Sequence, residues 1–270
     1  MNQLEIFCEG QVSPLGIDAL QPKLSWRVFS DVTVHTQRAY RVWVASSPEA
    51  LDRDEGDLWD SGRVEADCPA VVYAGLPLAS RQRCFWKVRM WSVGRELESS
   101  CRSWEMGLLK PEDWEARWIG NPASTDGGAL YFRRAFAIEG EVASARIYAS
   151  GLGYYELRLN GEKVGDSVLD PAWTAFDKRV LYSVYDVGEQ LLEGENVVGA
   201  IVGNGWYGMP KLLMQLEIYF RDGRKQRIIS RGGHTEAPSI WLAGRGPLRR
   251  NSVYDGEAYD ARRECPGWDA

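Results

Sequence analysis

Apolar and polar residues alternate with a period of two over many short stretches of this chain, from about residue 24 onwards. Pro, Gly, Asp and Ser separate these stretches, and no long window shows the 3.6-residue period of an amphipathic helix. Such a pattern is typical of short β-strands that are joined by turns and packed face to face. The sequence therefore predicts an all-β protein.

Two strands are expected at the centre of the first half of the chain. Residues 39–45 (AYRVWVA) place Tyr40, Val42 and Val44 on one face. Residues 84–93 (CFWKVRMWSV) place Trp86, Val88 and Met90 on one face, opposite Phe85, Lys87, Arg89 and Trp91. We expect these two strands to pair, and further strands at 58–63, 70–73 and 103–109. About seven strands in roughly 110 residues are typical of an immunoglobulin-like or fibronectin type III-like sandwich with Trp residues in its core.

A boundary follows near residue 112. Residues 113–121 (DWEARWIGN) interrupt the strand pattern, and residues 122–128 form a small, polar, Gly-rich stretch that packs poorly. A second domain then begins at 129.

Strands are expected in this second domain at 129–138, 142–150, 154–160, 180–187, 195–202, 212–220 and 224–230, with one helical turn at 187–192. Asn160-Gly161 predicts a tight hairpin before residues 163–165, because both residue types tolerate positive φ. Roughly eight strands without internal repeats favour a jelly-roll sandwich. In such a fold, function is carried by the end loops.

Composition excludes several classes of protein. The 38 acidic and 32 basic residues are mixed along the chain, so the net charge of -6 argues against binding to nucleic acid. The sequence contains neither a signal peptide nor an apolar run long enough for a membrane. The five cysteines lack CxxC pairs and disulfide-like spacing, which favours a reducing cytoplasm. Only His35 and His234 supply imidazoles, and we expect both at the surface.

The motifs of residues 151–186 and 203–208 carry a family resemblance. The YYELRLNG hairpin, the LDPAWTAFDKRVLYSVYDV segment and the GNGWYG loop resemble, in type and order, the N-terminal β-sandwich of bacterial α-L-rhamnosidases of glycoside hydrolase family 78. Residues 247–269 (PLRRNSVYDGEAYDARRECPGWD) resemble the exit segment that leads towards the catalytic region of that family. The resemblance implies a fibronectin-like domain at 1–112, a jelly-roll (galactose-binding-like) domain at 113–250 and an exit segment at 251–270.

No catalytic residue is expected within the chain. Members of that family continue into a large helical (α/α)₆ barrel that carries the acidic catalytic residues, and no helical region of that size occurs here. Glycoside hydrolysis needs two carboxyl groups at a defined separation. The acids nearest the family motifs are Glu156, Asp166, Asp170 and Asp177, and solvation of a hairpin or turn explains each of them without chemistry.

Sugar binding is the more credible activity, because aromatic faces stack on the C–H patches of sugars. The aromatic candidates are Tyr154, Tyr155, Trp173, Trp206 and Tyr207, although strand alternation turns one of the two adjacent tyrosines inward. Related modules of carbohydrate-binding module family 67 bind L-rhamnose with calcium. That resemblance implies ligands at Asn160 and Asn204. The alternative is that Asn160 is a turn residue and Asn204 a loop residue of positive φ.

Three functional hypotheses remain open. The chain can be the non-catalytic N-terminal part of a protein that hydrolyses terminal α-L-rhamnosides. It can instead be an autonomous, calcium-assisted L-rhamnose-binding module. It can also be a purely structural piece whose strip 255–268, including Asp260 and Arg262, docks on the catalytic barrel.

Overall fold

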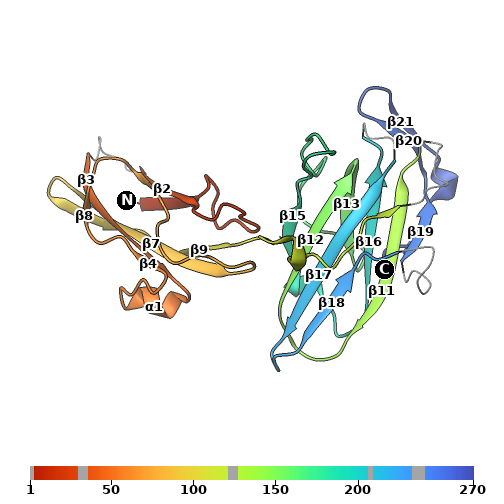
Figure 1. Ribbon diagram of the computed structural model, residues 1–270. Helices are drawn as coiled ribbons and strands as arrows, with labels where there is room; N and C mark the ends of the chain where they lie inside the picture. The colour runs from red at the N-terminus through yellow and green to blue at the C-terminus, as the bar shows by residue number, and fades with distance from the viewer. Residues whose placement is uncertain (1–2, 30–35, 121–126, 206–208, 233–240) are drawn as a thin grey trace. The chain divides into compact units, whose positions relative to one another are not determined.

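A computed structural model describes residues 3–29, 36–120, 127–205, 209–232 and 241–270. The chain divides into two compact units, Met1–Asp113 and Trp114–Ala270, here called unit 1 and unit 2 (Figure 1). Almost all of their regular structure is β-strand, which confirms the predicted fold class. The finer bounds 1–112, 113–250 and 251–270 stay predictions.

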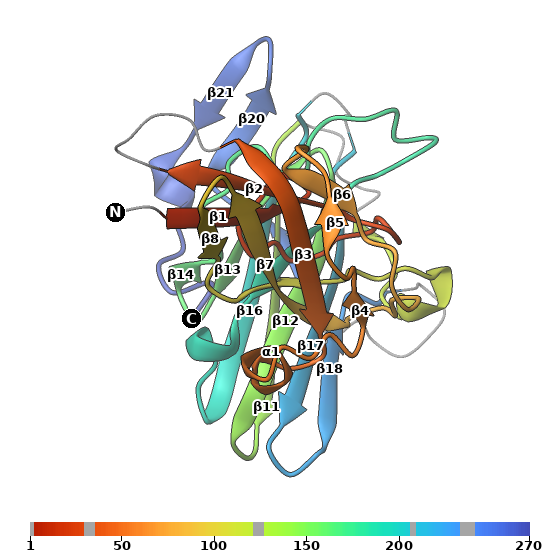
Figure 2. The same cartoon turned by 90° about the vertical axis from the view of Figure 1, so that its left-hand side faces the viewer.

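Unit 1 contains a three-stranded and a six-stranded antiparallel sheet (Figure 2). The first has the order β1-β2-β6; in the second, β4-β3-β7-β8 form the main path, β5 pairs with β3, and β9 pairs with β7. The strands are β1 (Gln3–Cys8), β2 (Lys23–Phe29), β3 (Gln37–Ala45), β4 (Trp59–Asp60), β5 (Val64–Glu65), β6 (Ala70–Val72), β7 (Arg83–Ser92), β8 (Arg95–Glu98) and β9 (Arg102–Glu105). A 3-10 turn, η1 (Pro111–Asp113), ends the unit.

The predicted central pair of unit 1 is confirmed. Strands β3 and β7 pair antiparallel with Val42 opposite Val88, and the two predicted apolar faces both lie in the core. Trp26, Trp86 and Trp104 are buried in that core, as expected. Trp43 lies on the opposite face of β3 and is nevertheless fully buried.

A short helix, α1 (Pro48–Asp52), contributes to the burial of Trp43. The guanidinium groups of Arg41 and Arg89 lie 4.6 and 5.0 Å from the centroid of the indole ring, so cations cover the rest of it. The sequence analysis did not predict α1. Its signal was present, however, because Ser47 caps the helix and Pro48 occupies its first turn.

Unit 2 is a sandwich of two five-stranded antiparallel sheets. One sheet has the order β10-β17-β12-β15 with β18 on β17, and the other has the order β14-β13-β16-β11-β19. The strands are β10 (Ile119–Gly120), β11 (Leu130–Ile138), β12 (Val142–Leu152), β13 (Tyr154–Leu159), β14 (Glu162–Lys163), β15 (Ser183–Asp186), β16 (Gly194–Gly203), β17 (Lys211–Phe220), β18 (Lys225–Ile229) and β19 (Leu242–Arg245). The predicted helical turn is the 3-10 turn η2 (Gly188–Gln190). The jelly-roll connectivity stays a prediction.

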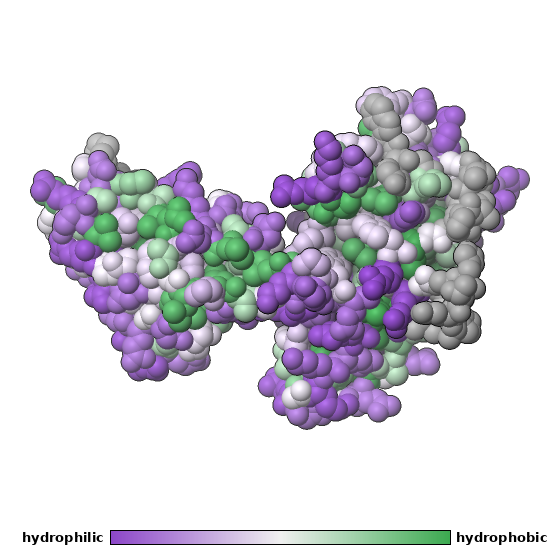
Figure 3. Space-filling model, viewed as in Figure 1, coloured by the Kyte–Doolittle hydropathy of each residue, from purple (hydrophilic) through white to green (hydrophobic). Residues whose placement is uncertain are grey.

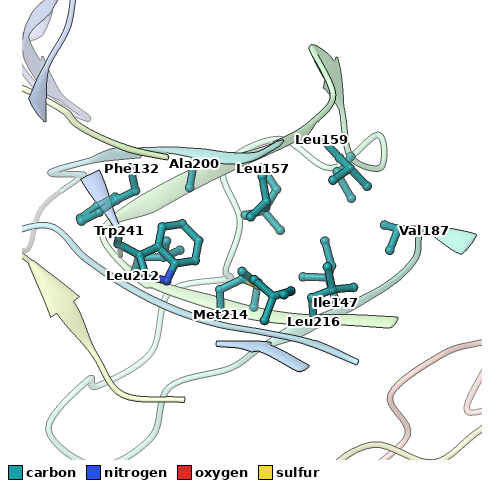
Figure 4. Packing of buried hydrophobic residues seen from close by; sticks show 14 of the residues in the cluster. Phe132, Ile147, Leu157, Leu159, Val187, Ala200, Leu212, Met214, Leu216 and Trp241 are labelled. Carbon is teal, nitrogen blue, oxygen red and sulfur yellow. The ribbon is translucent and has the colours of Figure 1, made fainter. Parts of the chain in front are cut away.

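The core of unit 2 lies between these sheets (Figure 4). Leu157, Leu159 and Ala200 of one sheet face Ile147, Met214 and Leu216 of the other. Alternation along β13 and β16 therefore turns Tyr154, Glu156, Ile201 and Gly203 to the outer face.

A separate hairpin of β20 (Leu248–Ser252) and β21 (Gly256–Tyr259) follows β19, and a 3-10 turn, η3 (Ala261–Arg263), precedes the last residues. The C-terminal segment, residues 265–270, then lies on the outer face of the β13-β16-β11 sheet. The Trp268 ring packs at 5.2 Å from Tyr131 and covers Gly199, whose Cβ would come within 2.8 Å of it. The Asp269 carboxylate accepts a hydrogen bond from Arg158.

No helix among the described residues is long and apolar enough to span a membrane. All five cysteines are unpaired; Cys8 and Cys84 are buried, and Cys68, Cys101 and Cys265 are exposed. Burial raises the pKa of the Cys8 and Cys84 thiols to about 12, so both stay protonated near neutral pH.

Candidate functional site

The predicted site residues do not gather at one place in unit 2. Strands β13 and β16 pair antiparallel, with Tyr154 opposite Gly203 and Leu159 opposite Val198. Asn204 therefore lies beside Tyr154 at one end of this ladder, and Asn160 lies at the other end. At 3.3 Å per residue, about 20 Å separates the two asparagines.

Asn160 is a structural turn residue. Asn160 and Gly161 have φ values of 51° and 84°, which is the two-residue hairpin turn that the sequence predicted. The Asn160 side-chain oxygen accepts from the Val197 amide at 2.8 Å, and its amide nitrogen donates to the Gln190 carbonyl and to Asn196 Oδ1, both at 2.9 Å. These bonds tie the hairpin to the neighbouring strand and to η2.

The two adjacent tyrosines have different roles. Tyr155 points into the core at 6% exposure, whereas Tyr154 lies on the outer face. The Tyr154 ring lies 6.4 Å from Trp173, which is half exposed and packs at 4.6 Å on Phe176. Tyr154 and Trp173 therefore remain candidates for sugar stacking, and Tyr155 does not.

Asp170 organises the loop between β14 and β15. Its Oδ2 atom accepts hydrogen bonds from the hydroxyls of Tyr155 (3.0 Å), Ser183 (2.6 Å) and Tyr185 (2.5 Å). Its carbonyl accepts from the Tyr155 amide at 2.8 Å. Burial, with Asp170 nearby, raises the pKa of both phenols, to about 12 for Tyr185. Asp170 is thus an anchor for the loop that carries Leu169 and Trp173.

The other three acids near the family motifs are not paired with Asp170. The Glu156 carboxylate forms an ion pair with Arg158 at 3.1 Å, and Asp166 and Asp177 are exposed. Each of the four acids therefore has a local structural or solvated role.

Asn204 is buried beside Asn251, a residue that the sequence analysis did not single out. The Asn204 amide donates to Asn251 Oδ1, and the Asn204 side chain donates to the Gly127 carbonyl. Asn204 Oδ1 and Asn251 Nδ2 are buried without a partner among the described residues. Because Asn251 lies 47 residues further along the chain, no local pattern could have predicted this contact.

A calcium ion shared by Asn160 and Asn204 does not fit this structure. The two side chains lie at opposite ends of the ladder, and Asn160 is occupied by hydrogen bonds. Calcium takes six to eight oxygen ligands, whereas the buried, unpartnered Asn204 oxygen supplies one. Among the described residues, no three His, Cys, Asp or Glu side chains form a metal-binding group.

A hollow of about 490 Å³ opens on the outer face of the sheet, next to Asn204. Tyr154, Glu156 and Ile201 form part of its floor. One wall is residues 167–169 of the Asp170 loop, and the other is the β20–β21 hairpin with Asn251 and Val253. The sequence analysis predicted neither wall as part of a site. Of the remaining candidates, Trp206 and Tyr207 lie outside the described residues, as do His35 and His234.

Both units match known protein families. Residues 4–110 match the Rha78A-like, N-terminal immunoglobulin domain, and residues 140–270 match the Alpha-L-rhamnosidase N-terminal domain. An α-L-rhamnosidase of Formosa agariphila is 35% identical over 96% of this chain, which spans only 30% of that enzyme's length.

Solved structures agree with these matches. The α-L-rhamnosidase from Dictyoglumus thermophilum superposes with a TM-score of 0.89 at 37% identity, over 98% of this chain and 32% of the enzyme. The native enzyme from Aspergillus terreus superposes with a TM-score of 0.84 at 30% identity, over the whole chain and 32% of the enzyme. Residues 4–110 are therefore a Rha78A-like immunoglobulin domain, and residues 140–270 are an α-L-rhamnosidase N-terminal domain.

Proposed function

We propose that this chain is the non-catalytic N-terminal part of an α-L-rhamnosidase-like glycoside hydrolase that acts on terminal α-L-rhamnosides. The observation that carries the proposal is the alignment of 96% of the chain with less than a third of a curated α-L-rhamnosidase. The two domains also follow each other as the family resemblance implies, with the immunoglobulin domain first.

The local geometry favours a scaffolding role for this chain over a catalytic one. The acids nearest the family motifs anchor a loop, pair with an arginine or face solvent. Hydrolysis of a glycoside would need two such groups across one scissile bond. In this proposal the catalytic barrel of the same full-length protein supplies them, and the chain works in a reducing cytoplasm.

A carbohydrate-binding role is the second candidate. It is favoured by the exposed Trp173 and the outward-facing Tyr154, whose rings lie 6.4 Å apart, and by the place of Tyr154 in the lining of the hollow. The calcium-assisted version of this role lacks its predicted pair of ligands, since Asn160 and Asn204 lie at opposite ends of the β13–β16 ladder.

A chimaera tests the first proposal. The Dictyoglumus thermophilum enzyme would be truncated by the region that this chain matches, and the chain would be fused in its place. We expect the truncated enzyme to lose hydrolysis of p-nitrophenyl α-L-rhamnoside and the fusion to regain it, while the chain alone releases no p-nitrophenol. Activity of the chain alone would refute the proposal, as would a fusion no better than the truncated enzyme.

A further inference from the structure

We propose that the hollow on the outer face of unit 2 is the binding site for a single neutral 6-deoxyhexose unit of a rhamnoside. This inference rests on the proposed function and adds a place and a recognition mechanism to it. It involves neither Asn160 nor a metal ion.

Glycines on the central strand make the hollow possible. Gly203 of β16 faces outward, and a Cβ there would lie 2.8 Å from Asn251 Oδ1. Gly205 has a φ of 55°, and its Cβ would lie 2.9 Å from the Tyr154 ring. A side chain at Gly203 would push against Asn251 in one wall, and a side chain at Gly205 would push against Tyr154 in the floor. The floor is therefore open to a ligand beside Tyr154.

One part of the hollow is aliphatic. Val168, Leu169 and Val253 are 78%, 67% and 57% exposed, and all three line it from opposite walls. On the face of the molecule that Figure 3 displays, apolar surface occurs as patches among polar residues. Exposed aliphatic side chains that converge on one hollow indicate a bound apolar group. A methyl group and the C–H face of a pyranose fit this requirement.

The other part is polar and carries little net charge. Its lining includes one cation, Lys163, and two carboxylates, Glu156 and Glu257. A phosphate or a uronate would meet more negative than positive charge there, so a neutral ligand is favoured. Glu156 can accept and Lys163 can donate hydrogen bonds to hydroxyls. Asn251 also lines the hollow, and its side-chain oxygen accepts a hydrogen bond from the Asn204 amide.

This combination of an aliphatic part and a polar part points to a 6-deoxy sugar rather than to other ligands. A ligand of this class presents a methyl group at C5 and hydroxyls on the opposite edge of its ring. The volume of about 490 Å³ is in the range of small-molecule sites. L-Rhamnose belongs to the class, which links the hollow to the proposed function.

Calorimetric titration of the 270-residue chain with methyl α-L-rhamnoside tests the site. Methyl α-L-mannoside is the matched ligand, because it differs only in having a hydroxyl on C6. We expect the rhamnoside to bind about tenfold more tightly, since the aliphatic part of the hollow has no hydrogen-bond partner for the extra hydroxyl. Equal binding of the two sugars, or no binding of the rhamnoside, would overturn the assignment.

Two variants locate the binding. Val168→Asp and Val253→Asp change opposite walls of the hollow at exposed positions, and each should weaken rhamnoside binding at least tenfold. Val93→Asp, at a 68% exposed valine of unit 1, is the control and should leave binding unchanged. Unaltered binding by both wall variants would place the sugar elsewhere. If the sugar site fails while the chimaera above regains activity, only the present inference is wrong.

Discussion

At the scale of single residues, Asp170 should stabilise unit 2 through the loop that it anchors. Its half-buried carboxylate accepts hydrogen bonds from the hydroxyl groups of Tyr155, Ser183 and Tyr185. We expect Asp170→Ala to lower the free energy of unfolding by about 3 kcal/mol, measured by urea denaturation. Asp166→Ala, four residues earlier and exposed, should change it by less than about 0.5 kcal/mol. Equal effects of the two variants would contradict the anchoring role.

The same cluster predicts a dependence of stability on pH. The pKa of Tyr185 is raised to about 12 by burial and by its bond to Asp170, whereas an unfolded tyrosine has a pKa near 10. Stability from this phenol is therefore complete below pH 10 and is lost as the pH rises towards 12. Tyr185→Phe should reduce the fall in the urea midpoint over this range. An identical fall in the variant would show that Tyr185 does not contribute.

Some residue roles could be predicted from the sequence and others could not. Strand alternation was enough to predict that one of Tyr154 and Tyr155 points inward, and the structure places Tyr155 in the core beside Leu157 and Leu159. The contacts of Asn204 with Gly127 and Asn251 join segments 77 and 47 residues apart. Such contacts depend on how the sheets assemble, and no local pattern encodes them.

At the scale of elements, the Asn160-Gly161 hairpin was predicted correctly because its turn chemistry is local. We expect Asn160→Ala to lower the free energy of unfolding by about 2 kcal/mol, because it removes three side-chain hydrogen bonds. Alanine also tolerates the positive φ at this position less well than asparagine does. Asn160→Gly should recover part of this loss, because glycine adopts the turn freely. Urea midpoints measure both variants.

Sugar binding supplies the decisive control for Asn160. Neither variant should alter the affinity for methyl α-L-rhamnoside, because Asn160 lies about 20 Å from Asn204 by strand geometry. A selective loss of affinity in Asn160→Ala, with the fold intact, would restore the ligand role that the structure argues against.

Helix α1 and the β20–β21 hairpin are among the elements that the sequence analysis did not predict, and each was missed for a physical reason. Helix α1 has only five residues, so no periodicity develops along it, and its capping serine and first-turn proline were the local signals. The β20–β21 hairpin has a largely exposed second strand without apolar alternation. Because that hairpin forms one wall of the hollow, the hollow itself could not be predicted from the sequence.

At the scale of the whole molecule, each unit has its own hydrophobic core. The core of unit 1 runs from Leu4 to Met106 and that of unit 2 from Ile119 to Trp241, with no shared residue. We therefore expect fragments 1–113 and 114–270 to fold when expressed separately, each with a cooperative thermal transition measured by circular dichroism. A fragment that lacks such a transition would contradict this independence.

The C-terminal segment has a consequence for how unit 2 folds during synthesis. Gly199 leaves a gap on the central strand that Trp268 fills, and Arg158 pairs with Asp269. All ten strands of the sandwich leave the ribosome before these two partners do. A nascent unit 2 therefore exposes the middle of its outer sheet face until residues 268 and 269 emerge, and a chaperone can bind that face in the interval.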